Sequence, residues 1–268
     1  MEILLQGTGA ADGIPAFFSE SRVSTYARAH GGKDIRTRSG ALIDGHLKLD
    51  FGPDSFAKVL RDRLNAREWS GIVFTHTHED HLCRAELQYM LHTFTEHLFA
   101  PLTIYGNGMV VERLQERFPD WPLEIIETRS FESFDHADYK ITPISAYHKL
   151  DEDSHNLIVE REGKTFLYGT DTGVWREPTW EFLPGFRFDA VVLECTDGFR
   201  KTDYFGHLDV NEFLQVTERL RSIGCIQDNS QVFTTHHCHL GDGTHDELQE
   251  FFAPPGVTVG YDGLKILL

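Results

Sequence analysis

Five short apolar segments of this chain end in a residue type that binds metal ions. The segments run into Asp50, His76, His148, Asp171 and His236. In layered α/β proteins the active crevice lies at one end of the strands, so five such endings can meet there. One polar ending carries little information, because a polar residue often marks the point where a strand leaves the core. Five endings of one chemical kind predict a single polar cluster that can hold cations.

Short strands alternate with helices along the chain, which is typical of an α/β fold with mixed sheets. The expected strands are Glu2–Gln6, Ser39–Ile43, Leu47–Asp50, Gly71–Thr75, Leu102–Tyr105, Lys140–Ala146, Asn156–Arg161, Thr165–Tyr168, Asp189–Glu194, Gln231–Thr235, Val257–Val259 and Leu264–Leu267. The expected helices are Pro53–Leu64, Asp80–Thr93, Met109–Phe118, Val210–Ile223 and His245–Phe252. Asp209 and Glu212 form a capping box for the fourth helix. Thr8–Arg38 lacks periodicity and is expected to be a functional loop within one domain, residues 1–268.

The charge balance narrows the choice of partners and compartment. Lys and Arg number 25 against 42 Asp and Glu, which leaves a net charge of −17 that repels long nucleic acid. No apolar run approaches the roughly 18–20 residues that span a bilayer, so no membrane insertion is expected. Four scattered Cys and the absence of a signal peptide favour a cytoplasmic protein with reduced thiols. The 15 His favour metal ligation through nitrogen and oxygen.

The second of the five segments runs into the sequence His-Thr-His-Glu-Asp-His, residues 76–81. In extended backbone His76 and His78 point to the same side, so their two imidazoles can hold one ion. Asp80 and His81 are expected where the next helix begins, turned to another side, where they can hold a second ion. Nitrogen and oxygen donors admit Mn, Zn or Fe and do not choose among them.

The motif and the later isolated ligands resemble the metallo-β-lactamase fold superfamily. Within it, several further stretches resemble the PhnP-type phosphodiesterases, which act beside carbon–phosphorus lyase on ribosyl cyclic phosphates, and the related tRNA 3′-processing endonucleases. These stretches are 7–15, Thr75–Leu82, Asp171-Thr172, His207-x-Asp209-x-Asn211, Thr235–His239 and 260–263. The resemblance implies a four-layered αββα sandwich with mixed sheets and two divalent metal ions.

Residue by residue, the resemblance implies the ligands of each ion. One ion would be held by His76, His78 and His148, and the other by Asp80, His81 and His236. Asp171 would bridge the two ions, and Asp50 would orient ligands without binding metal. Because this ligand set is rich in carboxylates, it slightly favours Mn or Fe over Zn.

His207 resembles the general acid of the family. Two cations lower the pKa of a water between them and neutralise phosphate oxygens, which permits attack on phosphorus. A phosphodiester then expels an alkoxide that needs a proton, and His207 can supply it. With Asp80 and Asp50, His207 completes the predicted catalytic residues. The predicted function is therefore a dinuclear phosphodiesterase acting on a small phosphodiester, with cyclic phosphodiesters among the candidates.

Three other functions stay open. They are a tRNA 3′-processing endonuclease, a lactone or thioester hydrolase on the same metal site, and a metal-binding sensor or interaction protein without turnover. The acidic charge counts against the first, and the intact ligand set against the last. The expected partner is a small-molecule substrate, and a homodimer is compatible with the sequence.

The early loop departs from the PhnP pattern. The three thiolates that hold a structural zinc in the family are replaced by Ser19, Ser21 and Ser24, and His239 loses its partners. The structural zinc is therefore expected to be absent, with packing or hydrogen bonds in its place. The same loop carries two aromatics and five cations, which can line a pocket or contact phosphate: Phe17, Phe18, Arg22, Arg28, Lys33, Arg36 and Arg38. His155 competes with His148 as a ligand, but His148 is preferred because it ends its strand.

Overall fold

The computed structural model describes residues 1–268 except 91–93, 96–101 and 121–123. Within the described residues the chain forms two seven-stranded sheets. The first has the order β14-β1-β2-β3-β4-β5-β6 and contains β1 Glu2–Gly7, β2 Gly40–Ile43, β3 Leu47–Leu49, β4 Gly71–Val73, β5 Thr103–Gly106, β6 Glu124–Glu127 and β14 Leu264–Leu267. The second has the order β13-β12-β11-β10-β9-β8-β7 and contains β7 Phe134–His136, β8 Tyr139–Ser145, β9 His155–Arg161, β10 Lys164–Gly169, β11 Phe188–Glu194, β12 Ile226–Thr235 and β13 Val257–Val259.

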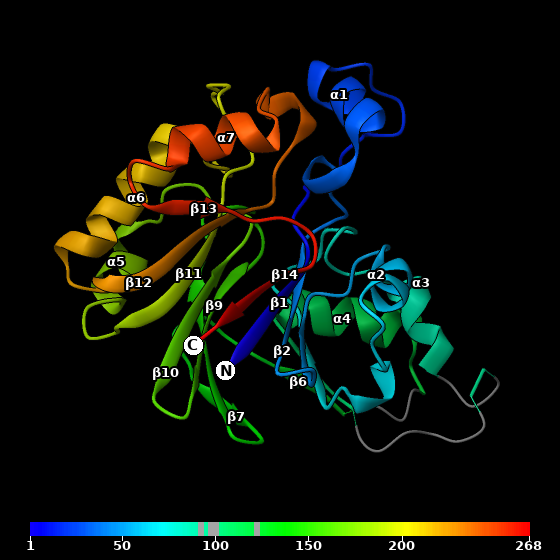
Figure 1. Ribbon diagram of the computed structural model, residues 1–268. Helices are drawn as coiled ribbons and strands as arrows, with labels where there is room; N and C mark the ends of the chain where they lie inside the picture. Colours follow the sequence, from blue (N-terminus) through cyan, green and yellow to red (C-terminus); the bar gives the residue numbers. More distant parts are fainter. Residues whose placement is uncertain (91–93, 96–101, 121–123) are drawn as a thin grey trace.

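The two sheets pack face to face, and helices cover their outer faces (Figure 1). Side chains such as Leu5 and Leu49 from the first sheet and Phe166 and Val192 from the second share one fully buried cluster. Burying each such side chain contributes about 1.5–3 kcal/mol. The described helices are α1 Arg22–His30, α2 Ser55–Arg61, α3 Arg84–Leu87, α4 Gly108–Arg117, α5 Glu177–Phe182, α6 Val210–Ser222 and α7 His245–Phe252. Short 3₁₀ turns lie at Gly32–Asp34, Ala66–Glu68, Gln88–Met90 and His239–Gly241.

Separate apolar clusters join the helices to the outer faces of the sheets. Phe213 of α6 and Phe252 of α7 belong to the cluster over the second sheet. Val110 and Leu114 of α4 belong to the cluster over the first sheet. The four layers are therefore helix, sheet, sheet and helix, as the αββα expectation requires.

Strand direction brings the five predicted endings to one edge. In the first sheet β3, β4, β5 and β6 run parallel. In the second sheet β10, β11, β12 and β13 run parallel. Strand β8 is antiparallel to β9, which is antiparallel to β10, so β8 points the same way as β10. The ligand types that follow these strands therefore leave each sheet at one edge, and the contacts between His76 and His148 and between His81 and His236 join the two edges.

The capping box of α6 is confirmed: the Asp209 carboxylate accepts hydrogen bonds from backbone N–H groups, and the Glu212 carboxylate accepts one from the backbone N–H of Asp209. The expected helix Asp80–Thr93 is wrong at its start, because α3 begins at Arg84, and its last residues, 91–93, lie outside the described residues. Backbone hydrogen bonds from Phe51 to His81 and from Cys83 back to Phe51 hold this stretch beside β3 as a turn. Asp80 and His81 consequently do not lie at a helix N-terminus.

Other differences arise where tertiary contacts outweigh weak local patterns. The stretch Thr8–Arg38 contains α1, in which Ser21 caps the N-terminus by accepting a hydrogen bond from the Ser24 N–H. The expected helix Pro53–Leu64 shortens to α2, and the sequence interpretation did not include α5, β6 or β7. Among the described residues α6 is the longest helix, with 13 residues, and none has the length and apolar character needed to cross a membrane.

Candidate metal centre

The predicted ligand residues lie together at the common edge of the two sheets, in two groups. Residues His76, His78, His148 and Asp171 place one ligand atom each within 4.8 Å of one another. Residues Asp80, His81 and His236 do the same. Apart from Asp171, which falls in the first group, the two groups have the members of the two ligand sets that the family resemblance implies.

Asp171 lies between the groups and faces both. One carboxylate oxygen, Oδ2, is 2.8 Å from His81 Nε2 and 3.0 Å from His236 Nε2. The other, Oδ1, is 3.5 Å from His148 Nε2 and 4.0 Å from His76 Nε2. A carboxylate with one oxygen toward each group is suited to bridge two cations.

Hydrogen bonds at the outer nitrogen of each ring direct the inner nitrogen toward the centre. His81 Nδ1 lies 2.7 Å from Asp50 Oδ2, and His148 Nδ1 lies 2.9 Å from the Gly206 carbonyl oxygen. His236 Nδ1 lies 2.9 Å from the Thr196 hydroxyl, and His76 Nδ1 lies 3.0 Å from the Thr75 hydroxyl. Such outer partners fix the tautomer and orientation of metal-binding imidazoles. In all four rings Nε2 is left for a metal ion.

Asp50 anchors this arrangement from behind the ligands. Its side chain is fully buried and accepts hydrogen bonds from the Thr75 N–H and hydroxyl at 2.9 Å and 3.0 Å, besides its contact with His81. This position agrees with an orienting role for Asp50, since it does not belong to either ligand group.

Three of the strand endings have left-handed backbone. The φ angles are 55° at Asp50, 44° at Asp171 and 56° at His236. Each such conformation costs on the order of 1 kcal/mol and persists only where surrounding contacts enforce it. Each strand therefore ends in a sharp turn that directs its ligand inward.

The donor set fits divalent cations. His76 Nε2 is buried and has no hydrogen-bond partner among the described residues, as expected for a nitrogen reserved for a metal ion. Burial alone would lower the pKa of His236, but the Asp171 and Asp80 carboxylates raise it to about 10. The same carboxylates raise the pKa of buried His81 well above its usual value. The centre thus strongly favours added positive charge, which metal ions supply when bound.

Glu194 belongs to the site, although the sequence interpretation did not include it. Its buried carboxylate lies 2.7 Å from His207 Nδ1 and also accepts hydrogen bonds from the backbone N–H groups of Thr172, Thr196 and Leu208. The signal was present, because β11 is a sixth apolar strand that ends in a possible ligand type, Glu194. Burial alone would lower the pKa of His207, but the Glu194 carboxylate raises it above the usual value.

The His207 ring lies beside both ligand groups. Its centroid is 4.9 Å from that of His148 and 5.6 Å from that of His236. A nitrogen of His207 also lies within 4.8 Å of ligand atoms of Asp171 and His236. The Nδ1 atom is held by Glu194, so Nε2 is the nitrogen that can serve chemistry at the centre.

The competing histidines lie elsewhere. His155 Nε2 is 3.1 Å from Asp153 Oδ2, and His155 belongs to neither ligand group. His237 Nε2 pairs with the Thr234 hydroxyl. These contacts agree with the preference for His148, and His237 likewise belongs to neither ligand group.

The early loop is linked to the body of the protein through His239. The Ser21 and Ser19 hydroxyls lie 2.9 Å and 3.2 Å from His239 Nδ1. Asp12 Oδ2 lies 2.6 Å from His239 Nε2. Asp12, Cys238 and His239 also place ligand atoms within 4.8 Å of one another. Hydrogen bonds therefore hold the loop at the place where the family resemblance implies a structural zinc.

The loop cations and aromatics lie differently from the expectation of a substrate pocket. Arg22 pairs with Asp242 and Glu247, and Arg38 pairs with Asp54. Buried Arg36 donates to the Thr8 hydroxyl and the Gly260 carbonyl, and Arg28 donates to the Ala16 carbonyl. Lys33 lies over the Tyr261 ring. Phe17 and Phe18 are directed largely into solvent, with exposed fractions of 77% and 104%.

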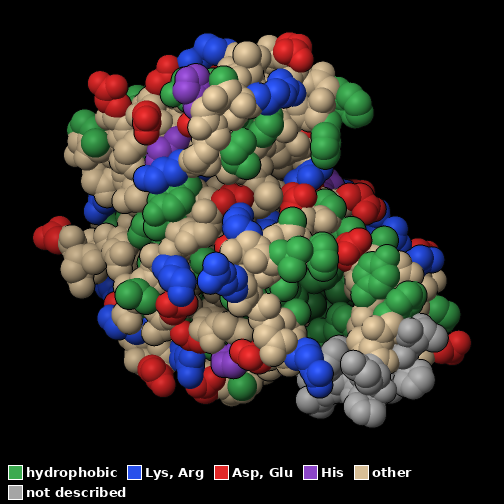
Figure 2. Space-filling model, turned by 45° about the vertical axis from the view of Figure 1, so that its right-hand side comes forward, with side chains coloured by type: hydrophobic (Ala, Val, Ile, Leu, Met, Phe, Trp, Pro, Cys, Tyr) green, Lys and Arg blue, Asp and Glu red, His purple; other side chains and the backbone are tan. Residues whose placement is uncertain are grey.

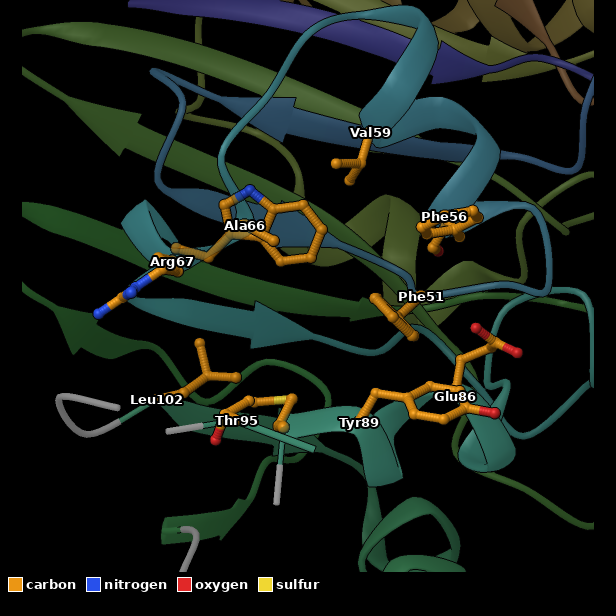
Figure 3. Close-up of a pocket in the computed structure, with 12 residues that line it drawn as sticks. Phe51, Phe56, Val59, Ala66, Arg67, Glu86, Tyr89, Thr95 and Leu102 are labelled. Carbon is orange, nitrogen blue, oxygen red and sulfur yellow. The ribbon is translucent and has the colours of Figure 1, made fainter. Parts of the chain in front are cut away.

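A separate apolar cavity of about 270 Å³ lies between α2, α3 and the start of β5 (Figure 3). Phe51, Phe56, Val59 and Leu102 are among its lining residues, and Glu86 is its one described carboxylate. The face shown in Figure 2 has a hollow lined by hydrophobic side chains, with acidic and basic groups around it. The described residues that line this cavity do not include a set of metal ligands, and the ligand groups above lie at a different place on the molecule.

The comparisons with known proteins agree with this geometry. The family model described as a beta-lactamase superfamily domain matches residues 47–237. The chain is similar to the crystal structure of a new diphosphatase from the PhnP family, with 21% identity and a TM-score of 0.78 over 100% of this chain and 97% of that one. It is also similar to Zn²⁺-bound PqqB from Methylobacterium extorquens, with 17% identity and a TM-score of 0.77 over 100% of both chains.

A third similar structure is the short form of human tRNase Z, with 18% identity and a TM-score of 0.66 over 100% of this chain and 99% of that one. No curated protein matches the sequence. At these identities the solved structures show a shared fold, and the family model, which covers most of the chain, shows descent. The chain therefore belongs to the beta-lactamase superfamily and has the fold of the metal-dependent hydrolases of the metallo-β-lactamase type.

Proposed function

We propose that this protein is a dinuclear metal-dependent phosphodiesterase acting on a small phosphodiester. The observation that carries the proposal is the Glu194–His207 pair beside the two ligand groups. Metal ligands alone would serve any hydrolysis on this fold. A histidine held ready to donate a proton is most useful when the leaving group is a poor one.

The residues divide the work between binding and proton transfer. His76, His78 and His148 would hold one ion, Asp80, His81 and His236 the other, with Asp171 between them. When bound, two divalent ions supply an activated water and neutralise the phosphate oxygens. Asp50 keeps His81 in the tautomer that presents Nε2 to the centre.

His207 would protonate the departing alkoxide. Glu194 accepts the Nδ1–H hydrogen bond, which leaves the Nε2–H to be donated toward the centre. Because Glu194 raises the pKa of His207, a larger fraction of the imidazole is protonated at neutral pH than in a free histidine. An alkoxide leaving group needs this proton, whereas an activated acyl group or a nitrophenolate does not.

The net charge of −17 supports a small substrate over long RNA, whose backbone would be repelled. A lactone or thioester hydrolase would use the same ligands without a proton donor of raised pKa. The activity of a diesterase on an alkoxide leaving group would depend on His207, whereas the activity of a lactone or thioester hydrolase would not.

The test uses metal-stripped protein reloaded separately with Mn²⁺, Zn²⁺ or Fe²⁺. Substrates are bis(p-nitrophenyl) phosphate, whose leaving group needs no proton, and a nucleoside 2′,3′-cyclic phosphate, whose leaving group is an alkoxide. We expect metal-dependent turnover of both. In His207→Ala the loss should be about 10²–10⁴-fold on the cyclic substrate and small on the nitrophenyl ester.

His155→Ala serves as the control, because His155 is another histidine that pairs with a carboxylate, here Asp153, but it lies outside the ligand groups. Absence of turnover on both diesters with every metal, despite two bound ions, would refute the diesterase and direct attention to lactones and thioesters. An equal, small loss on both substrates in His207→Ala would refute the proton-donor role.

A further inference from the structure

A continuous set of aromatic side chains lies beside the metal centre and has no role in the chemistry above. Tyr204 and Phe205 have ring centroids 5.2 Å apart, and Phe205 lies 4.6 Å from Tyr147 with an interplanar angle of 30°. The Arg176 guanidinium lies 4.0 Å over the Tyr147 ring. We call Tyr147, Tyr204 and Phe205 the aromatic wall.

The aromatic wall is next to the proton donor. The Tyr204 centroid is 5.4 Å from that of His207 and 6.5 Å from that of His148. Tyr147 directly precedes His148, and its backbone N–H donates to the Thr172 hydroxyl beside Asp171. A group bound against Tyr204 would therefore lie on the side of the centre where His207 donates its proton, which is the side of the leaving group.

Close contacts fix the position of the loop that carries Tyr204 and Phe205 of the aromatic wall. The Gly206 carbonyl accepts the hydrogen bond from His148 Nδ1 at 2.9 Å. A Cβ at Gly206 would lie 2.8 Å from the Tyr204 ring, and a Cβ at Gly173 would lie 1.7 Å from the Phe205 carbonyl oxygen. Gly173 needs glycine, because a Cβ there would meet the Phe205 backbone, whereas at Gly206 the Tyr204 ring packs directly on the glycine. The Tyr204 ring is thus positioned before any substrate binds, which reduces the entropy cost of binding.

Despite this fixed position, the wall is not part of the core. Tyr204 is 48% exposed and Phe205 38% exposed, and neither belongs to a buried apolar cluster. The ring of Tyr147 contacts Phe205 and Arg176. Tyr204 lies next to His207 and is partly exposed, so its ring is the one that a ligand at the centre can contact. Within the described residues Arg176 forms no ion pair with a carboxylate, so its charge remains beside the wall.

We infer that the aromatic wall is a stacking subsite for a nucleobase on the leaving-group side of the substrate. The inference rests on the proposed function and narrows it to base-bearing phosphodiesters over simple ribosyl or alkyl diesters. Stacking on an aromatic ring tightens the binding of a planar base roughly 5- to 150-fold, and it does so for all bases, because every base has a π-face. Tyr204 is then a specificity-determining residue, while His207 remains the proton donor.

The test compares two substrates with the same reacting group. Adenosine 2′,3′-cyclic phosphate carries a base, and methyl riboside 2′,3′-cyclic phosphate carries a methyl group in its place. For the wild-type protein we expect kcat/KM to be about tenfold or more higher for the adenosine compound. The difference should lie in KM, because stacking remote from phosphorus stabilises the ground state and the transition state equally.

Three variants separate stacking from other effects. In Tyr204→Leu the ratio of the two kcat/KM values should fall to about one. Tyr204→Phe keeps the ring and should keep the ratio. Phe199→Leu is the matched control, because Phe199 is 41% exposed at the start of the same loop but contacts Phe251 of α7. Metal content measured for each variant shows whether the centre is intact.

The outcomes distinguish the two proposals. Turnover of both substrates with a wild-type ratio near one, or an unchanged ratio in Tyr204→Leu, would overturn the stacking subsite and leave the diesterase standing. Turnover of neither substrate, with bis(p-nitrophenyl) phosphate also left intact, would overturn the diesterase. Whenever neither cyclic phosphate is hydrolysed, calorimetric binding to the metal-loaded protein decides the subsite: tighter binding of AMP than of ribose 5-phosphate, lost in Tyr204→Leu, supports it, and equal binding overturns it.

Discussion

Replacing Asp50 by Asn tests the orienting shell of the metal centre. Asp50 is fully buried, and its two oxygens accept from His81 Nδ1 at 2.7 Å and from the N–H and hydroxyl of Thr75 at 2.9 Å and 3.0 Å. An asparagine has the same shape and tolerates the φ of 55° at this position. It offers one oxygen and one NH₂ group, so a donor of His81 or Thr75 must face another donor.

The loss of one acceptor oxygen in Asp50→Asn has a cost in stability and in metal affinity. A buried donor without an acceptor costs about 1–3 kcal/mol, and losing an outer partner of a ligand typically lowers metal affinity 10–100-fold, or about 1.4–2.7 kcal/mol. Because His81 belongs to one ligand group only, the loss should fall on one of two ions.

Calorimetric titration of metal-free protein with Zn²⁺ or Mn²⁺ measures both affinities. We expect one binding constant to fall 10–100-fold in Asp50→Asn and the other to change little. Asp153→Asn is the control, because Asp153 pairs with His155 away from both ligand groups. If both constants of Asp50→Asn equal those of the wild type, the orienting role is refuted. An equal fall in both would show that the turn as a whole, and not His81, was disturbed.

Three further predictions concern other parts of the site and core. Glu194→Gln removes the charge that raises the pKa of His207, so the alkaline fall of kcat/KM on a cyclic phosphodiester should move to lower pH; an unmoved limb in the pH profile would contradict the pairing. His148→Ala should reduce the metal content measured by elemental analysis, whereas His155→Ala should not, and the reverse result would exchange their roles. Phe213→Ala, at a fully buried position facing Phe252, should lower the free energy of unfolding by about 3–5 kcal/mol in denaturant titration of metal-free protein; a loss below 1 kcal/mol would contradict its place in the core.

The raised pKa of His207 also has a consequence for stability. Because its pKa is higher in the folded protein than in the unfolded chain, the interaction with Glu194 stabilises the fold fully at pH below the unfolded value of about 6.5. This contribution is lost as the pH rises through the folded value. Wild-type protein without metal should therefore lose more stability between pH 6 and pH 9 than Glu194→Gln loses.

Strand endings were readable from the sequence because β-strands are short, apolar and bounded by sharp changes in polarity. Asp50, His76, His148, Asp171 and His236 follow such segments, and strand direction then brings them to one edge. The preference for His148 over His155 rested on the same rule, and the contacts agree with it. The capping box at Asp209 was equally local and equally readable.

Tertiary structure decided what local patterns could not. Backbone hydrogen bonds with Phe51 hold residues 78–83 beside β3 as a turn. Helix α3 therefore begins only at Arg84. Glu194 looked like an ordinary strand end, and only the loop carrying His207, folded over it, shows it as the partner of the proton donor.

Periodicity and polarity along a sequence thus determined which residues can be ligands and where strands end. They did not determine which outer nitrogen, carbonyl or aromatic ring lies against which ligand. That pairing depends on contacts between residues far apart in the sequence, such as His81 with His236 or His148 with Gly206, which only the closed packing of two sheets brings together.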